Sequence, residues 1–274
     1  MKAIVISASS DIGAAACERW ISAGWEISGT YRNYSEKVAR MEQRGAFLVK
    51  CDLAIAESIR NACVELGSHR EHWDVLVLAA GMLEPVGPFI DGDFDEWEAS
   101  LQINLVSQLR AVRGLMRYRA SNGKVPTVIF FAGGGTNNAV VNYSSYTLSK
   151  IGLIKMCELL DAEVTDTKFV ILGPGWVNTK IHDSTIAAGP NAGDSYYQAV
   201  SRLENDNWTP MAIVLECCDW VIREKREIVS GRNFSVVNDA WSTETLRDLL
   251  QRDANLYKLR RFGNELLMPK GKAR

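Results

Sequence analysis

The sequence of 274 residues has no apolar run that approaches the about 20 residues a helix needs to cross a bilayer. It also has no dominant charge, because 31 lysines and arginines nearly balance 33 aspartates and glutamates and leave a formal net charge of −2. This balance argues against nucleic acid or an anionic membrane surface as a partner. The first residues enter an apolar strand pattern rather than a signal-peptide pattern, so we expect a cytoplasmic protein.

Patterns for metal binding and for disulfide chemistry are missing as well. The six cysteines are scattered and form no Cys-x-x-Cys pair, which is typical of reduced residues in a protein core. Of the three histidines, His69 and His72 lie close together, but they fall at the polar end of a predicted helix, where solvation explains them. The sequence therefore predicts no metal site.

Short apolar runs that alternate with helical patterns are the main feature of the chain. The predicted strands lie near residues 3–7, 25–30, 46–51, 74–81, 128–131, 169–172 and 233–237. Helical spacing of apolar residues separates most of these runs, and a long helix at about 94–119 is expected to be interrupted near Asn104. This alternation is typical of an α/β fold with a Rossmann-type, doubly wound parallel sheet.

One predicted helix, within residues 143–155, carries a chemically useful pair. Tyr146 and Lys150 are four residues apart, so a helix places them on one face. A nearby ammonium lowers the pKa of a phenol, which can then exchange a proton with an alcohol. Taken alone, such a pair is more often a solvated helix face. Glycine-rich turns at 132–135 and 173–175 follow the flanking strands, however, and ligands of parallel sheets collect at such strand ends, which favours catalysis.

The order and spacing of these features resemble the short-chain dehydrogenase/reductase family across about residues 2–238. The series runs through a turn that ends in Gly13, Asp52, Ala79-Ala80-Gly81, Asn104, Tyr146 with Lys150, and Pro174-Gly175 with Thr179. The resemblance implies a nicotinamide cofactor and hydride transfer to or from a carbonyl or alcohol. It further implies that Tyr146 is the general acid/base, that Lys150 lowers its pKa and binds the nicotinamide ribose, and that Asn104 holds a relay water.

The resemblance also implies a set of cofactor-binding residues. Asp52 and Leu53 would border the adenine, Ala80 and Gly81 the adenosine ribose, and Thr179 the carboxamide or the pyrophosphate. The full predicted set is Ser7, Ser9, Ser10, Asp11, Ile12, Arg32, Asp52, Leu53, Ala80, Gly81, Tyr146, Lys150, Pro174, Gly175, Val177 and Thr179. The second strand ends in Thr30-Tyr31-Arg32, with an arginine suited to a 2′-phosphate and no carboxylate for a ribose hydroxyl. We therefore expect NADP(H) rather than NAD(H), although a solvated surface arginine is the simpler interpretation of Arg32 by itself.

Two segments depart from the family pattern around the cofactor. The turn Gly-x-x-x-Gly-x-Gly reads Ser7 to Gly13 and keeps only its last glycine. Asp11 in this turn would repel a pyrophosphate unless its carboxylate points away, as it would when capping the helix. The family's Asn-Ala-Gly is replaced by Ala79-Ala80-Gly81, which removes an amide side chain.

A third departure concerns the substrate. The family's catalytic serine, thirteen residues before Tyr146, falls on Gly133, so another group must polarise the substrate oxygen. The candidates are Thr136, Ser144, Ser145 and the backbone N–H groups of the glycine run. The predicted substrate contacts are Gly133, Thr136 and Trp176, although core packing explains Trp176 equally well.

The domain organisation and partners follow from the same resemblance. We expect a dinucleotide-binding and catalytic domain at 1–238, with a substrate lid at 182–208, and a C-terminal extension at 239–274. The segments 132–136 and 255–261 resemble a bacterial subgroup linked to surface-polysaccharide and modified-sugar pathways, so a polar, sugar-derived substrate is expected. Related enzymes pair their long helices, which implies a homodimer or homotetramer through about 94–119 and 143–164.

Two other functions stay open at this stage. The altered turn and Gly133 would suit a cofactor-binding sensor or scaffold that has lost its chemistry, although such a protein would not need both Tyr146 and Lys150. A sugar-nucleotide epimerase with tightly held NAD is the other alternative, but little sequence is left for a separate sugar-binding domain.

Overall fold

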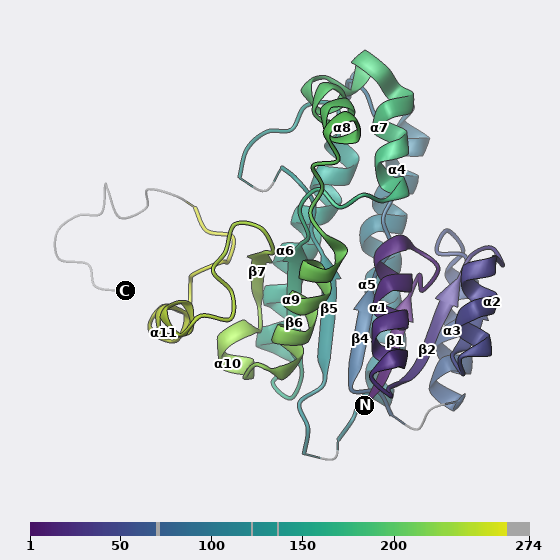
Figure 1. Ribbon diagram of the computed structural model, residues 1–274, viewed down its shortest axis with the longest axis vertical. Helices are drawn as coiled ribbons and strands as arrows, with labels where there is room; N and C mark the ends of the chain where they lie inside the picture. The colour runs from purple at the N-terminus through teal and green to yellow at the C-terminus, as the bar shows by residue number, and fades with distance from the viewer. Residues whose placement is uncertain (70–71, 122, 136, 262–274) are drawn as a thin grey trace.

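A parallel sheet of seven strands forms the centre of the fold (Figure 1). The computed structural model describes residues 1–69, 72–121, 123–135 and 137–261. The strands are β1 (Lys2–Ile6), β2 (Glu26–Tyr31), β3 (Phe47–Lys50), β4 (Val75–Leu78), β5 (Thr127–Phe131), β6 (Lys168–Gly173) and β7 (Arg232–Ser235). They lie in the order β3-β2-β1-β4-β5-β6-β7, and each neighbouring pair is parallel. The predicted Rossmann-type sheet is confirmed.

The central strands consist mainly of apolar residues because helices cover both faces of the sheet. Every residue of β4 and of β5 is buried, as expected for parallel strands that lie between two layers of helices. The strand order reverses between β1 and β4, and this reversal opens the crevice in which doubly wound sheets bind their ligands.

Helices cover both faces of this sheet. They are α1 (Asp11–Ser22), α2 (Glu36–Gln43), α3 (Ala56–His69), α4 (Phe94–Leu101), α5 (Ser107–Leu115), α6 (Ser144–Glu163), α7 (Asp183–Ala188), α8 (Asp194–Asn205), α9 (Met211–Arg223), α10 (Arg226–Val229) and α11 (Glu244–Arg252). Helices α1, α2 and α9 share a buried apolar cluster with one face of the sheet, and α3, α5 and α6 share a second cluster with the other. The α1 and α9 side faces the viewer in Figure 1. All six cysteines are buried and free.

The long helix predicted over about 94–119 is interrupted where the sequence suggested. A π-helical turn, Gln102–Val106, separates α4 from α5, and Asn104 lies at its centre. A 3₁₀ turn, Met116–Tyr118, follows α5. Single π-turns inside helices recur at functional sites, and this one faces the loop that leaves β4.

The segment predicted as a lid contains two helices, the short α7 and the longer α8, joined by a 3₁₀ turn, Gly189–Ala192. Both helices lie beyond the carboxyl ends of the strands, at the top of Figure 1. A further 3₁₀ turn, Lys180–His182, connects them to the segment that follows β6. In the described part of the chain, no helix has the length and hydropathy to cross a membrane.

Residues between β7 and position 261 pack against the rest of the chain. Helix α11 buries Leu246 and Leu250 in the same cluster as α1 and α9. The buried guanidinium of Arg232, the first residue of β7, donates hydrogen bonds to the carbonyls of Leu250 and Leu256. These contacts hold the first part of the C-terminal extension at the β7 edge of the sheet.

Candidate active site

Apart from Tyr146 and Lys150, the predicted cofactor residues fall in five segments at the carboxyl edge of the sheet. These are the β1–α1 turn (Ser7, Ser9, Ser10, Asp11, Ile12), the segment after β2 (Arg32), the segment after β3 (Asp52, Leu53), the segment after β4 (Ala80, Gly81) and the segment after β6 (Pro174, Gly175, Val177, Thr179). Since parallel strands end at one edge, the fold brings together positions that lie up to 172 residues apart in the sequence, from Ser7 to Thr179.

Tyr146 and Lys150 lie side by side on α6, at this same edge. The Lys150 Nζ atom lies 5.4 Å from the centroid of the Tyr146 ring and donates a 3.0 Å hydrogen bond to the carbonyl of Phe131, the last residue of β5. Lys150 is buried, whereas Tyr146 is half-buried. Within the described residues the Tyr146 hydroxyl has no hydrogen-bond partner, so it is available to a ligand.

The electrostatics of this pair differ from the sequence-based expectation. Burial raises the pKa of Tyr146 to about 12 and lowers the pKa of Lys150 to about 8. We expected the ammonium to lower the pKa of the phenol. The direction is reversed because loss of solvent disfavours both charged forms, and the ammonium is bonded to the Phe131 carbonyl rather than to the phenol oxygen. At neutral pH the phenol therefore keeps its proton.

The backbone of Gly133 lies directly against the Tyr146 ring. A Cβ atom placed on Gly133 would be 2.4 Å from the Tyr146 hydroxyl oxygen, far inside any normal contact. Of the other candidate donors, Ser144 accepts a 2.9 Å hydrogen bond from the Trp97 indole. The Ser145 hydroxyl is fully buried and has no partner among the described residues. Thr136 lies outside the described residues, so its predicted role has no structural test.

Asn104 holds the loop after β4 in place. Its side-chain oxygen accepts a hydrogen bond from Met82 N–H at 3.0 Å, and its side-chain nitrogen donates to the Met82 carbonyl at 2.9 Å and to Ser100 Oγ at 3.2 Å. Its own carbonyl accepts a 2.7 Å hydrogen bond from the side chain of Gln108. The relay-water role of Asn104 stays a prediction, and the buried Gln108 is a neighbour that the sequence reasoning missed. Its position four residues after Asn104 on a helix was the available signal.

The β1–α1 turn keeps a suitable shape without its glycines. Ser7 occupies the left-handed region with φ of 63°, and its N–H donates to Thr30 Oγ1 at 2.9 Å. Ser10 caps α1 by accepting the N–H of Gly13 at 3.1 Å. At Gly13 a Cβ would lie 2.4 Å from the Ser7 carbonyl oxygen, so only glycine allows helix and strand to approach this closely. The turn thus presents the N-terminus of α1 to the crevice, where it favours an anion.

Asp11 does not cap α1 as expected, because Ser10 takes that position. The Asp11 carboxylate accepts hydrogen bonds from Lys37 Nζ at 2.6 Å and from Lys180 N–H at 2.8 Å. Burial acts to raise the pKa of Asp11, but the bonds from Lys37 and Lys180 lower it below its usual value. The carboxylate therefore connects the β1–α1 turn to α2 and to the segment after β6.

The remaining predicted cofactor residues differ in their exposure to solvent. Arg32 is exposed directly after β2 and has no bonding partner within the described ranges. Asp52 turns the chain after β3 by accepting the Ala54 N–H at 2.9 Å. Gly81 is exposed and faces the Tyr146–Lys150 pair, since a Cβ placed there would lie 3.9 Å from Lys150 Nζ. Leu53, Ala80 and Val177 are buried.

Trp176 connects the segment after β6 to residues 182–208, the predicted lid. Its ring stacks on His182 with centroids 4.9 Å apart, and the Arg202 guanidinium lies 5.1 Å from its centroid. The ring centroids of His182 and Trp208 are 5.3 Å apart. This packing is the alternative considered for Trp176 at the sequence level, and a direct substrate contact of Trp176 stays a prediction.

A small apolar cluster surrounds Tyr146, and the sequence reasoning did not find it. Its buried members are Leu83, Tyr143 and Ala192, and its partly buried members are Val86, Val140, Tyr146, Ile181, Ala188 and Tyr196. The cluster joins the loop after β4, the start of α6 and the lid. The hydroxyls of Tyr143 and Thr185 hydrogen-bond at 2.9 Å and fasten α7 to α6. The packing of these side chains against Tyr146 accounts for the desolvation of the phenol.

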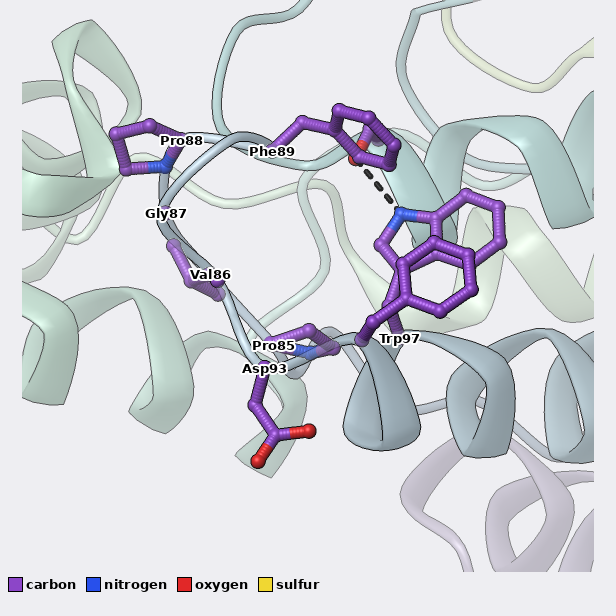
Figure 2. Close-up of a pocket in the computed structure, with 10 residues that line it drawn as sticks. Pro85, Val86, Gly87, Pro88, Phe89, Asp93 and Trp97 are labelled. Carbon is purple, nitrogen blue, oxygen red and sulfur yellow. Dashed lines mark hydrogen bonds between the residues drawn. The ribbon is translucent and has the colours of Figure 1, made fainter.

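A hollow of about 50 Å³ lies beside this cluster, between the loop at 85–93 and the start of α4. Trp97 closes one side of it with Phe89 and Phe94, whereas the carboxylate of Asp93 points away (Figure 2). Drug-sized ligands occupy pockets of about 300 Å³ or more, so this hollow is too small for a dinucleotide.

Comparisons with known proteins concern the family and the fold of the chain. Residues 1–188 match a protein-family model described as short chain dehydrogenase. The short chain dehydrogenase tazN of Aspergillus terreus is 26% identical over 76% of this chain, but the match spans only 42% of that relative's own length. The solved structure of the KRED1-Pglu enzyme has a TM-score of 0.75 at 23% identity, covering 85% of this chain and 99% of the other. A structure of actinorhodin polyketide ketoreductase with NADPH has a TM-score of 0.75 at 19% identity, with coverages of 86% and 95%.

Proposed function

The chain belongs to the short chain dehydrogenase family, and from this premise we propose that it is an NADP(H)-dependent oxidoreductase with Tyr146 as general acid/base. It transfers hydride between the nicotinamide and a carbonyl or alcohol of a small molecule. The observation that carries this proposal is the pairing of Tyr146 with Lys150 at the carboxyl edge of the sheet, where the phenol has no other partner among the described residues.

The residues at the crevice fit a nicotinamide dinucleotide. Lys150 uses one of its three N–H bonds on the Phe131 carbonyl, which leaves two for ribose hydroxyls. The N-terminus of α1 and the bare Gly81 leave room for the pyrophosphate and for a ribose. When bound, the cofactor supplies the hydride, and the protein supplies position and a proton.

The protonated phenol suits the reduction of a carbonyl. Because the phenol of Tyr146 is protonated at neutral pH, it can donate its proton to the oxygen of a carbonyl that receives the hydride. The buried Lys150 ammonium then stabilises the phenolate that this donation leaves. In the reverse reaction the same phenolate would take the proton back from the alcohol. We therefore propose that Tyr146 is the general acid in carbonyl reduction.

NADP(H) preference rests on Arg32. The guanidinium lies directly after β2, where an adenosine 2′-phosphate would be placed in this fold, and its exposed side chain is free to reach that phosphate. The segment Thr30–Asn33 contains no carboxylate that would select NAD(H) instead.

The substrate is a small carbonyl compound that reaches Tyr146 under the lid at 182–208. A polar, sugar-derived substrate was expected from the sequence. The side chains around Tyr146 are mostly apolar, however, and Leu83, Ile181 and Ala188 offer no hydrogen bonds to a polyol. We propose that at least one side of the reacting carbonyl carries an apolar group.

Oligomerisation through the long helices is part of the same proposal. Val106, Leu148 and Leu159 are exposed apolar side chains on the π-turn and on α6. Pairing of α5 and α6 across a twofold axis would cover them, which supports a homodimer or homotetramer. Light scattering after size-exclusion chromatography measures this directly.

The second candidate function is a sensor or scaffold that binds the cofactor without chemistry. It is favoured by Gly133, which stands where the family's catalytic serine would be and leaves the turn after β5 without that hydroxyl. In that case NADPH would bind and no carbonyl would be reduced.

The test is NADPH oxidation with a panel of cyclic ketones, aryl ketones and keto-sugars. We expect turnover with apolar ketones, and a drop of about 10²-fold or more in kcat for Tyr146→Phe with NADPH affinity retained. Unchanged turnover in Tyr146→Phe would remove Tyr146 from the chemistry. NADPH binding without turnover on any ketone would support the sensor.

A further inference from the structure

A buried glutamine connects the helix after the π-turn to the loop after β4. Gln108, the second residue of α5, is fully buried. Its side-chain nitrogen donates hydrogen bonds to the carbonyl of Ala80 at 3.2 Å and to the carbonyl of Asn104 at 2.7 Å. One amide group therefore holds two backbone carbonyls that belong to different parts of the fold.

The oxygen of the same amide has no hydrogen-bond partner in the described part of the chain. A buried acceptor without a partner costs free energy, and an apolar side chain of the same length would avoid both this cost and the desolvation of the amide. The stability of the fold therefore gains little from a glutamine at this position. What Gln108 supplies is a fixed position for the two carbonyls that it holds.

The loop after β4 is anchored on both sides of Gly81. Asn104 bonds the residue after Gly81 through both its N–H and its carbonyl, and Gln108 bonds the carbonyl of the residue before it. Gly81 lies between these two anchors, and a Cβ placed on it would be 3.9 Å from Lys150 Nζ. The π-turn and α5 together therefore set the distance between the backbone of Gly81 and the Lys150 ammonium.

We propose that Gln108 is a positioning residue for the cofactor, because it fixes the loop after β4 and so keeps Gly81 at its distance from Lys150. The gap between this backbone and the ammonium is the space that a ribose of the dinucleotide would occupy. Without the amide of Gln108, the loop keeps only its Asn104 anchor. The proposal deepens the function proposed above and rests on a cofactor bound in this crevice.

The test compares NADPH binding by wild type, Gln108→Met and the matched control Gln102→Met. Methionine nearly keeps the length of glutamine but has no N–H to donate. Gln102 lies on the π-turn and donates to Ser107 Oγ at 3.2 Å, so its replacement removes a bond within the helical segment itself. In a fluorescence titration we expect about 10-fold weaker NADPH binding by Gln108→Met and a change of less than about twofold for Gln102→Met.

Unfolding and hydrogen exchange separate this role from a purely structural one. Gln108→Met loses two hydrogen bonds but also loses an unpaired buried oxygen, and these changes offset each other. Its melting temperature without cofactor should therefore stay within about 3 °C of wild type. The amides at 80–83 should exchange faster in Gln108→Met and at the wild-type rate in Gln102→Met, because only Gln108 anchors the loop.

A second variant, Gln108→Glu, keeps the shape of the side chain, and its ionised carboxylate has no hydrogen to donate. It should weaken NADPH binding at least as much as Gln108→Met. Wild-type affinity in both Gln108 variants, or an equal loss of affinity in Gln102→Met, would overturn the proposal. A much lower melting temperature of Gln108→Met with unchanged NADPH affinity would also overturn it.

The titration distinguishes failure of this proposal from failure of the proposed function. If the wild type binds NADPH but reduces no ketone of the panel, the oxidoreductase function fails and the titration still decides the role of Gln108. If the wild type reduces ketones and Gln108→Met binds NADPH as tightly as the wild type, only the role of Gln108 fails. A wild type that binds neither NADPH nor NADH would overturn both.

Discussion

The buried ammonium of Lys150 should make the protein less stable than it would be with an apolar side chain there. Lys150 is 3% exposed and donates one hydrogen bond, to the Phe131 carbonyl. Its pKa is lowered from 10.5 to about 8 because burial disfavours the charged form. Lys150→Met removes the charge and nearly keeps the volume, so we expect a protein that is inactive and more stable.

The magnitude follows from the shift in pKa. One pKa unit corresponds to about 1.4 kcal/mol, so a fall from 10.5 to about 8 amounts to about 3 kcal/mol of unfavourable burial. Loss of the hydrogen bond to the Phe131 carbonyl offsets about 1 kcal/mol of this. Lys150→Met should therefore raise the free energy of unfolding by about 2 kcal/mol at pH 7.

The pH dependence of the free energy of unfolding is a second test of whether the buried Lys150 ammonium destabilises the protein. Below pH 8 the amine is charged in both the folded and the unfolded protein, so the full penalty of burial is present. Between pH 8 and 10.5 the unfolded chain still holds the proton while the folded protein releases it, so the stability of the wild type rises with pH. Above pH 10.5 the penalty is gone.

The assay is urea unfolding of wild type and Lys150→Met, without cofactor, at pH 7 and at pH 10. The comparison cancels the other titrating groups, because both proteins contain them. We expect the advantage of Lys150→Met to shrink as the pH rises. A variant that is less stable at pH 7, or an advantage that does not change with pH, would refute the assignment of Lys150 as a desolvated cation.

Three further predictions concern cofactor binding and the lid. Arg32→Ala should weaken NADPH binding by about 10-fold or more and leave NADH binding unchanged in a fluorescence titration; an equal loss for both would make Arg32 a surface residue. Asp11→Asn removes a negative charge at the N-terminus of α1, so NADPH should bind several-fold more tightly at low salt and less so at high salt; weaker binding would mean that the contacts of Asp11 organise the site. Tyr143→Phe removes the bond to Thr185, so proteolysis within 182–208 should accelerate, whereas an unchanged cleavage rate would show that the apolar cluster alone holds the lid.

Local sequence patterns were sufficient to predict the sheet. Parallel strands covered on both faces read as continuous apolar runs, and β4 and β5 are of this kind. The polar Asn104 inside an apolar helix pattern also marked the π-turn. The segment 182–208 was harder to predict, because Gly189, Pro190 and Gly193 interrupt it and hide the helices α7 and α8 on either side of them.

The candidate site depended more on long-range contacts. The spacing of Tyr146 and Lys150 predicted their shared face. The direction of their pKa shifts depends on burial, to which Leu83 and residues 188–196, far away in the sequence, contribute. Asp11 reaches Lys37 and Lys180, which are 26 and 169 residues away. No local pattern specifies such partners, so the capping role expected for Asp11 was wrong.

The measurement that tests the central claim most directly is isotope transfer from NADPH that carries deuterium at the transferable C4 position. The protein would be incubated with this cofactor and a ketone from the panel, and the alcohol analysed by mass spectrometry. We predict one deuterium on the carbinol carbon with wild type and about 10²-fold less labelled alcohol with Tyr146→Phe. Alcohol formed without deuterium, or labelled equally by Tyr146→Phe, would contradict hydride transfer assisted by the Tyr146 phenol.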